Sequence, residues 1–330
     1  MTPRNESSEI AQAFPGAVVD LYGGAELAAQ LAANRAGTTP EPGSDAAPDI
    51  LAGVAAAAAA EQRGVSWETA QEAARGTKEL FAQLLPSVEV PELAELRAAG
   101  IDFERLETGF EAYEAAGMEP MLVIAPVNLP LDKWRDMYTN LQAWQEAAYP
   151  EPPQGTADPL QGRRLKRQTD GNGLYINPNI EPVWDDLNQQ AVDQTPGASF
   201  TGSDGIVWKA LVVPAASRED GGLAVNTSHD LSTRNLDAQL NALGLAPNQV
   251  NQQDAHMPIG TYLTLQAERF ASSGSPIDSN TWTWNAGTFT SGGLRAPASV
   301  WGPGYGLVYV DHDVVDDSGD FVGTRLPVWG

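Results

Sequence analysis

The sequence predicts an α+β protein in which helices come early and short strands come late. Three observations predict this order. The first part of the chain is rich in alanine, the middle holds isolated apolar runs of strand length, and the residues after Gly274 form short aromatic runs separated by glycine. With 330 residues, the chain is long enough for one large core or for two domains.

The first 87 residues are expected to form a helical N-terminal region. A Pro/Gly-rich linker interrupts it at residues 38–45. Ser66 is a suitable N-cap for a helix that begins near Trp67, and an apolar stripe continues this helix at Leu80, Leu84 and Leu85. We expect residues 88–330 to form a second, larger domain.

Apolar periodicity predicts seven elements in this larger domain. Helices are expected at 91–99, 103–116, 132–147, 236–243 and 260–272, and buried strands at 121–126 and 207–213. Gly117 is in the position of a C-terminal helix glycine. Residues 149–203 are rich in Pro, Gly and Asn, and their pattern predicts no element.

Composition excludes several classes of function. The net charge of -24 argues against nucleic acid as a partner, because Lys and Arg must neutralise the phosphates. The chain has no cysteine, which excludes disulfides, thiolate nucleophiles and cysteine-bound metals. The first residues lack a signal-peptide pattern, and no apolar run approaches the ~18 residues of a membrane span. We expect a soluble protein without membrane insertion, in a compartment that the sequence does not identify.

No motif predicts an enzyme or a cofactor. The three histidines have no second ligand at metal-binding spacing, and a structural or surface role is expected for His229 and His256. The chain contains neither a nucleophile elbow nor a phosphate-binding glycine loop. We therefore expect no catalytic residue, no metal and no cofactor.

An aspartate-rich run near the C-terminal end allows several interpretations. It contains Asp311, Asp313, Asp316, Asp317 and Asp320. One interpretation is a calcium site. The spacing differs from that of an EF-hand calcium loop, because Val315 occupies a ligand position and Asp316 stands where glycine is required. The same carboxylates are candidates for sugar cleavage, with Trp282, Trp284 and Trp301 stacking on the substrate. The simplest alternative is a solvated turn between short strands.

A set of landmarks in the second half of the chain resembles a known family. They are Tyr262-Leu263-Thr264-Leu265-Gln266, Pro276-Ile277-Asp278, Thr281-Trp282-Thr283-Trp284, Ala296-Pro297, Trp301, Gly306 and Gly323-Thr324-Arg325-Leu326-Pro327-Val328. In this order they resemble the C-terminal half of the variable proteins of diversity-generating retroelements. The resemblance is good over residues 200–330, thin over 100–200 and absent before that.

The resemblance implies a C-type-lectin-like domain over residues 88–330, a fold related to formylglycine-generating enzymes. It also implies a hypervariable segment at about 285–325 whose codons are rewritten by adenine-directed mutagenesis. One departure is Gly323-Thr324-Arg325, where the family often has Gly-Phe-Arg. Because the related enzymes depend on cysteines, their chemistry is excluded here.

Composition gives an internal test of the resemblance. Randomising the adenines of an Asn codon that ends in a pyrimidine never yields Lys, Glu, Gln, Met or Trp. From Ala286 to Gly330 the chain has no Lys, Glu, Gln or Met, and its two tryptophans there, Trp301 and Trp329, would be fixed. Turn-rich β segments also favour Gly, Asp, Val and Tyr, which is the alternative explanation.

If the fold is shared, residues 308–313 form a strand whose Tyr309, Asp311 and Asp313 lie on one face. The candidate ligand-binding residues are Val300, Gly302, Tyr305, Tyr309, Asp311, His312, Asp313, Asp317, Gly319 and Phe321. The supporting scaffold is expected to include Trp282, Trp284, Trp301, Arg325 and Trp329.

The predicted function is non-enzymatic binding of an unknown protein or surface ligand. The alternatives are a carbohydrate-binding or carbohydrate-active protein, and a virion or tail component that binds receptors.

Overall fold

The structure, a computed structural model, describes residues 67–150, 160, 163–168, 171–215, 222–271, 276–279 and 281–330. In this part of the chain helices and sheets are mixed, as expected for an α+β protein. The helices and the linker expected within residues 1–66 lie outside the described residues.

The helices are α5 (Trp67–Leu84), α6 (Leu93–Ala98), α7 (Phe103–Ala115), α8 (Leu131–Ala148), α9 (Trp184–Gln194), α10 (Asp237–Leu243), α11 (Gln252–Ala255) and α12 (Ile259–Ala271). Short 3-10 helices are η1 (Glu181–Val183) and η3 (Pro247–Gln249). The strands are β1 (Pro120–Pro126), β2 (Arg167–Gln168), β3 (Gly171–Asn172), β4 (Leu174–Ile176), β5 (Phe200–Thr201), β6 (Val207–Pro214), β7 (Ala224–Val225), β8 (Trp282–Trp284), β9 (Phe289–Thr290), β10 (Leu294–Gly302), β11 (Leu307–Val314), β12 (Val322–Thr324) and β13 (Val328–Trp329).

All seven elements predicted by apolar periodicity are present, with small differences at their ends. Gly117 adopts a φ of 77° after α7, as a C-terminal glycine does. Within residues 149–203 the structure adds α9, η1 and the short strands β2 to β5, which were not predicted. The buried positions of α9 include Asn188, and Asp and Gln surround them, so its apolar stripe is short.

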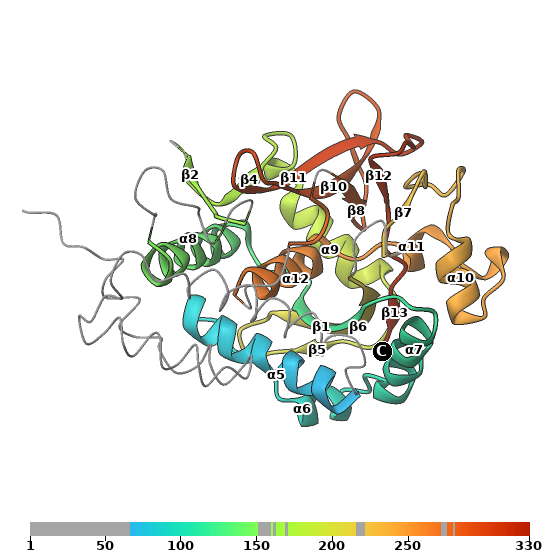
Figure 1. Cartoon of the computed structure of the whole chain (residues 1–330), viewed down its shortest axis with the longest axis horizontal. Coiled ribbons are helices and arrows are strands. Elements are labelled where there is room, and N and C mark those ends of the chain that lie inside the picture. The colour runs from blue at the N-terminus through green and yellow to red at the C-terminus, as the bar shows by residue number, and fades with distance from the viewer. Residues whose placement is uncertain are drawn as a thin grey trace, which may run out of the picture.

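The lower sheet forms the centre of the main core. Its strands follow the order β1-β6-β13 and are antiparallel, with β5 also paired to β6. Every residue of β6 is buried. Figure 1 shows α12 above this sheet and α5, α6 and α7 below it, so helices cover both faces. This explains the continuous apolar run of β6, since neither face meets water.

The upper sheet carries most of the C-terminal residues. Its order is β4-β11-β10-β8-β12-β7, with β9 paired to β10. Trp301 of β10 packs edge-on against Phe270 of α12, with ring centroids 4.8 Å apart. One face of the sheet therefore packs on α12, and Figure 1 places the sheet at the top of the molecule, away from the lower sheet.

Helix α5 belongs to the main core. Leu80, Phe81 and Leu84 are buried there, and the ring of Phe81 lies 5.4 Å from that of Trp208. The last helix expected in the N-terminal region thus shares a core with the elements after residue 88.

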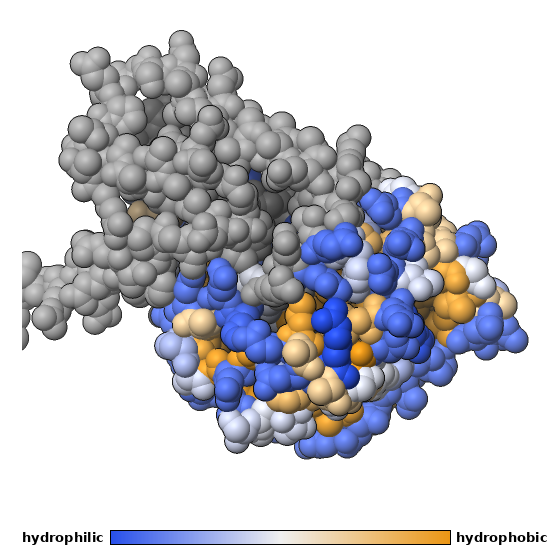
Figure 2. Space-filling view, turned by 90° about the horizontal axis from the view of Figure 1, so that it is seen from below, coloured by the Kyte–Doolittle hydropathy of each residue, from blue (hydrophilic) through white to orange (hydrophobic). Residues whose placement is uncertain are grey.

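Figure 2 shows the molecule from below, where hydrophobic residues lie among hydrophilic ones over the described part of that face. Among the described helices, none has both the length and the apolar character needed to cross a membrane.

Candidate functional site

The hairpin of β10 and β11 has two different faces. Residues opposite each other in an antiparallel pair share a face. Tyr309, Asp311 and Asp313 are opposite Val300, Ala298 and Ala296. The alternate positions Trp301, Val308 and Val310 are fully buried. Tyr309, Asp311 and Asp313 therefore lie on one face, directed away from the main core, as the alternation predicts. On the same face, Ala296 and Ala298 are buried in a smaller cluster with Trp284.

Three tyrosines gather at one end of this outer face. The ring centroid of Tyr309 is 5.3 Å from that of Tyr175 on β4 and 6.0 Å from that of Tyr305. Tyr305 is 67% exposed, and the other two are half-buried. Partial burial, followed by the proximity of Tyr305, raises the pKa of Tyr309. We call Tyr175, Tyr305 and Tyr309 the tyrosine cluster.

Gly302 makes room for this cluster. A Cβ atom at residue 302 would lie 2.7 Å from Cε2 of Tyr309, closer than side chains pack. Any side chain there would displace the Tyr309 ring. Gly302 thus contributes to the outer face by its lack of a side chain.

Aspartates continue the outer face along β11. Asp311 accepts a hydrogen bond of 2.6 Å from Nδ2 of Asn177, and Asp313 lies 3.5 Å from Nη1 of Arg295. Partial burial and then the negative charge of Asp313 raise the pKa of Asp317. Negative charge is therefore concentrated at this end of the strand.

Beyond the aspartates, Phe321 presents a second aromatic surface. Its side chain is 52% exposed. Gly319 lies beside it, and a Cβ atom there would be 3.0 Å from Cε1 of Phe321. The exposed candidates thus run from tyrosines through aspartates to a phenylalanine.

Two candidate ligand-binding residues add no exposed area to the outer face. Val300 is only 4% exposed, so its side chain offers no contact area although it is opposite Tyr309. His312 is one position out of step with Tyr309 and Asp311, so it projects from the other face. Its ring meets that of Phe289 edge-on at 5.4 Å, and its Nε2 lies 3.2 Å from Nδ2 of Asn179. Alternation predicted which residues share a face but not how deeply each is covered.

The expected scaffold residues are buried, with one exception. Trp284, Trp301, Trp329 and Arg325 are at most 2% exposed, whereas Trp282 is half-buried. Buried tryptophans cannot stack on a sugar, so the carbohydrate interpretation loses Trp284 and Trp301 as its platform. Among the described residues, no three His, Asp or Glu side chains are grouped to hold a metal ion.

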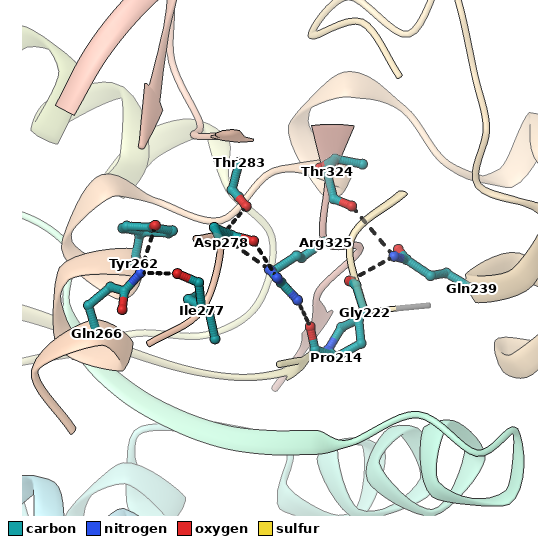
Figure 3. A network of polar contacts seen from close by, with 10 residues as sticks. All are labelled: Pro214, Gly222, Gln239, Tyr262, Gln266, Ile277, Asp278, Thr283, Thr324 and Arg325. Carbon is teal, nitrogen blue, oxygen red and sulfur yellow. Dashed lines mark hydrogen bonds and ion pairs between the residues drawn. The ribbon is translucent and has the colours of Figure 1, made fainter. Parts of the chain in front are cut away.

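Arg325 forms a buried ion pair with Asp278, shown in Figure 3. Arg325 also donates a hydrogen bond of 2.5 Å from Nη1 to the carbonyl oxygen of Pro214. Thr283 donates a hydrogen bond of 2.5 Å to Oδ2 of Asp278. These contacts join the end of β6, the loop before β8, and the residues after β12. They anchor the chain on both sides of the β10–β11 hairpin.

His229 and His256 form a second buried polar group. Their rings stack with centroids 4.3 Å apart. His229 Nε2 lies 3.0 Å from the carbonyl oxygen of Asn285, and Gln252 donates to His229 Nδ1 at 2.8 Å. Burial lowers the pKa of His229 well below its usual value and that of His256 to about 4. Both rings are therefore neutral near pH 7, which fits the expected structural role.

The structure adds residues that the sequence did not predict. Tyr175 and Asn177 reach the outer face because β4 pairs in parallel with β11, and Asn177 and Asp311 are 134 positions apart in the chain. Nothing in the local pattern of residues 149–203 indicates such a long-range pairing.

Comparisons with protein-family models, with curated proteins and with solved structures found no match for this chain. A proposal for its function therefore depends on the geometry and the composition of the chain.

Proposed function

We propose that this protein is a non-enzymatic ligand-binding protein with a C-type-lectin-like domain and a hypervariable C-terminal surface that a retroelement diversifies. One observation carries the proposal. Within the expected hypervariable segment and its borders, Trp284, Trp301 and Arg325 are buried while Tyr305 and Phe321 are exposed. A surface built to vary needs this separation, because only exposed positions change without damage to the core.

The side chains on the outer face suit binding. Tyrosine and phenylalanine give large, rigid contact areas at a low cost in side-chain entropy, as in antibody loops. Aspartates beside them supply charged, directional contacts. The outer face therefore has the composition of a ligand-binding surface.

Codon chemistry supports the same proposal. Adenine replacement in an Asn codon that ends in a pyrimidine gives Tyr, Asp, Gly, Val and Phe, which are the residue types of most candidate positions. It gives no Lys, Glu, Gln or Met, and these four are absent from Ala286 to Gly330.

A binding experiment tests the proposed face. Ligands are selected against the whole protein from a random peptide library displayed on phage. The double variant Tyr309→Ser/Asp313→Asn is expected to bind the selected peptides at least ~10-fold more weakly, which is the effect of losing about 1.4 kcal/mol. The matched control is Glu104→Gln/Glu111→Gln on α7, which removes two exposed charges on the opposite side of the molecule. Peptides that bind both double variants alike would show that the face is assigned wrongly.

A carbohydrate-binding protein is the second candidate, because the partly exposed tyrosine cluster beside Asp311 and Asn177 is also a surface on which a sugar ring can stack. A glycan array with added calcium separates the two candidates. Recognition of many sugars would favour the carbohydrate function, and no recognition would favour a protein ligand. A virion or tail component would use the same face and would differ only in location.

A further inference from the structure

We propose that β4 and the turn after it form a constant half of the binding surface, and that this surface binds an arginine or lysine side chain of a protein partner. This inference rests on the proposed function and adds to it the chemistry of the partner and residues outside the hypervariable segment.

Strand β4 runs parallel to β11 and is paired with it. Tyr175 and Tyr309 are opposite each other in a parallel pair, and their rings are 5.3 Å apart. Two residues further along, Asn177 donates to Asp311 at 2.6 Å, and its backbone N–H donates to Val310 at 2.9 Å. Asn179 then approaches His312 at 3.2 Å.

Tyr175 and Asn177 of this segment thus contact two positions of the outer face, Tyr309 and Asp311. Residues 175–179 lie outside the segment expected to vary, at about 285–325. A ligand on the outer face at Tyr309 and Asp311 also meets Tyr175 and Asn177. The constant segment therefore contributes to every binding surface that variation produces on β11.

The tyrosine cluster and Asp311 together suit a cationic group. Within the described residues, Asp311 accepts two hydrogen bonds, and both go to Oδ1. The donors are Nδ2 of Asn177 at 2.6 Å and the backbone N–H of His312 at 2.8 Å. The other carboxylate oxygen can accept from a ligand. The faces of tyrosine rings attract cations, and a carboxylate forms its strongest hydrogen bonds with a guanidinium or ammonium group.

Negative charge surrounds this part of the face. Asp313, Asp316 and Asp317 follow on the same strand end, and the whole chain carries a net charge of -24. Such a field accelerates the approach of a cationic partner and repels an anionic one. Within the described residues, Arg295 pairs with Asp313 at 3.5 Å, and Asp311 forms no ion pair. We therefore expect a partner's cation to bind at Asp311 and the tyrosine cluster.

The test uses the whole protein and a short random peptide library displayed on phage, selected at physiological salt. We expect the selected peptides to be enriched in arginine or lysine. Replacing the selected arginine by citrulline, which keeps its shape and removes its charge, should weaken binding at least ~10-fold. Asp311→Asn and Tyr175→Ser should each weaken it at least ~5-fold, whereas Tyr175→Phe keeps the ring face and should bind nearly as well as the wild type.

Controls separate local recognition from general attraction to an acidic protein. Glu104→Gln/Glu111→Gln removes more charge than Asp311→Asn but is expected to leave binding unchanged. Thermal unfolding of Tyr175→Ser confirms that this variant is folded.

The outcomes distinguish this inference from the proposed function. Neutral or acidic selected peptides, or peptides that bind Tyr175→Ser as they bind the wild type, would overturn the inference. If such peptides still lose affinity for Tyr309→Ser/Asp313→Asn, the proposed face stands and only the inference fails. Both the inference and the proposed function would be overturned if the peptides bound every variant of the face as they bind the wild type, or if the library yielded no binding peptide.

Discussion

Arg325 and Asp278 illustrate how single residues hold the display surface in place. Both side chains are fully buried and pair with each other, and Arg325 also binds the carbonyl oxygen of Pro214. Buried charges of this kind are stable only while they remain paired. The pair therefore fixes the loop before β8 against the residues after β12.

Replacement of Arg325 by methionine is expected to lower the free energy of unfolding by about 3–5 kcal/mol, because Asp278 is left as an unpaired buried charge. Urea unfolding measures this loss. The matched control is Arg295→Met, whose pair with Asp313 is partly exposed and should contribute less than about 1 kcal/mol. Equal losses in the two variants would mean that the buried pair is not an anchor.

Glu268 on α12 gives a prediction about pH. Burial raises the pKa of its carboxyl group from 4.5 to about 8, and Thr77 of α5 donates a hydrogen bond to it. The folded protein thus binds a proton near pH 7 that the unfolded chain releases. The stability that this proton gives is fully present below a pH of about 4.5 and is lost as the pH rises towards about 8.

Glu268→Gln removes this titration. Between a pH of about 5 and about 8, the stability of the wild type relative to the variant should fall by about 1.4 kcal/mol per pH unit. Urea unfolding of both proteins across this range gives the difference directly. A constant difference would show that the carboxyl group is ionised in the folded state.

At the residue scale, the sequence predicted the scaffold better than the surface. Trp284, Trp301 and Arg325 stand at recognisable landmarks and are buried as predicted. The burial of Val300 was not predictable, because strand alternation specifies a face but not its covering by other segments. Tyr175 was missed since its contact with Tyr309 arises only from the paired strands.

Strand β12 shows how closely the elements of the upper sheet approach one another. It pairs with β7 and β8, and Gly323 is its middle residue. A Cβ atom at residue 323 would lie 2.1 Å from the carbonyl oxygen of Ala224. Only glycine permits this approach, so the position constrains how β7 and β12 pair.

Gly323→Ala is expected to destabilise the protein by about 1–3 kcal/mol, because the backbone of β7 has to move. Gly304→Ala is the control, since an added Cβ there meets nothing within 4 Å. Thermal unfolding compares the two variants. If Gly323→Ala unfolds at the same temperature as Gly304→Ala, then β7 and β12 are less tightly paired than described.

Elements with strong apolar periodicity were predictable, and those held by long-range contacts were not. The continuous apolar run of β6 and the apolar stripe of α8 were sufficient to predict these two elements. By contrast, α9 has only Trp184, Leu187 and Ala191 as buried apolar positions, and β4 has three residues paired with a distant strand. Their structure depends on partners that the local sequence does not show.

Over the whole molecule, one core joins α5 to both sheets. Phe81 of α5 lies in this core with Trp134 of α8 and Trp208 of β6, and Trp301 of the upper sheet belongs to the same cluster. Unfolding of the described part is therefore expected to be cooperative rather than to occur separately in α5 and in the sheets.

Phe81→Ala tests this continuity. We expect a loss of about 3–5 kcal/mol, and coincident transitions when unfolding is followed by tryptophan fluorescence and by helix circular dichroism. Phe321→Ala serves as the control, because that side chain is half-exposed and should contribute far less to stability. A separate early transition in helix content would mean that α5 is not part of the common core.

The central claim is that exposed positions of the outer face vary while the buried scaffold does not. Sequencing the DNA that flanks the gene tests it most directly, by a search for a near-copy of the region that encodes Ala286–Gly330. We expect such a copy, with mismatches confined to its adenines and located at codons of outer-face residues such as Tyr305, Tyr309 and Asp313. The absence of a copy, or mismatches concentrated at the codons of Trp301 and Arg325, would contradict it.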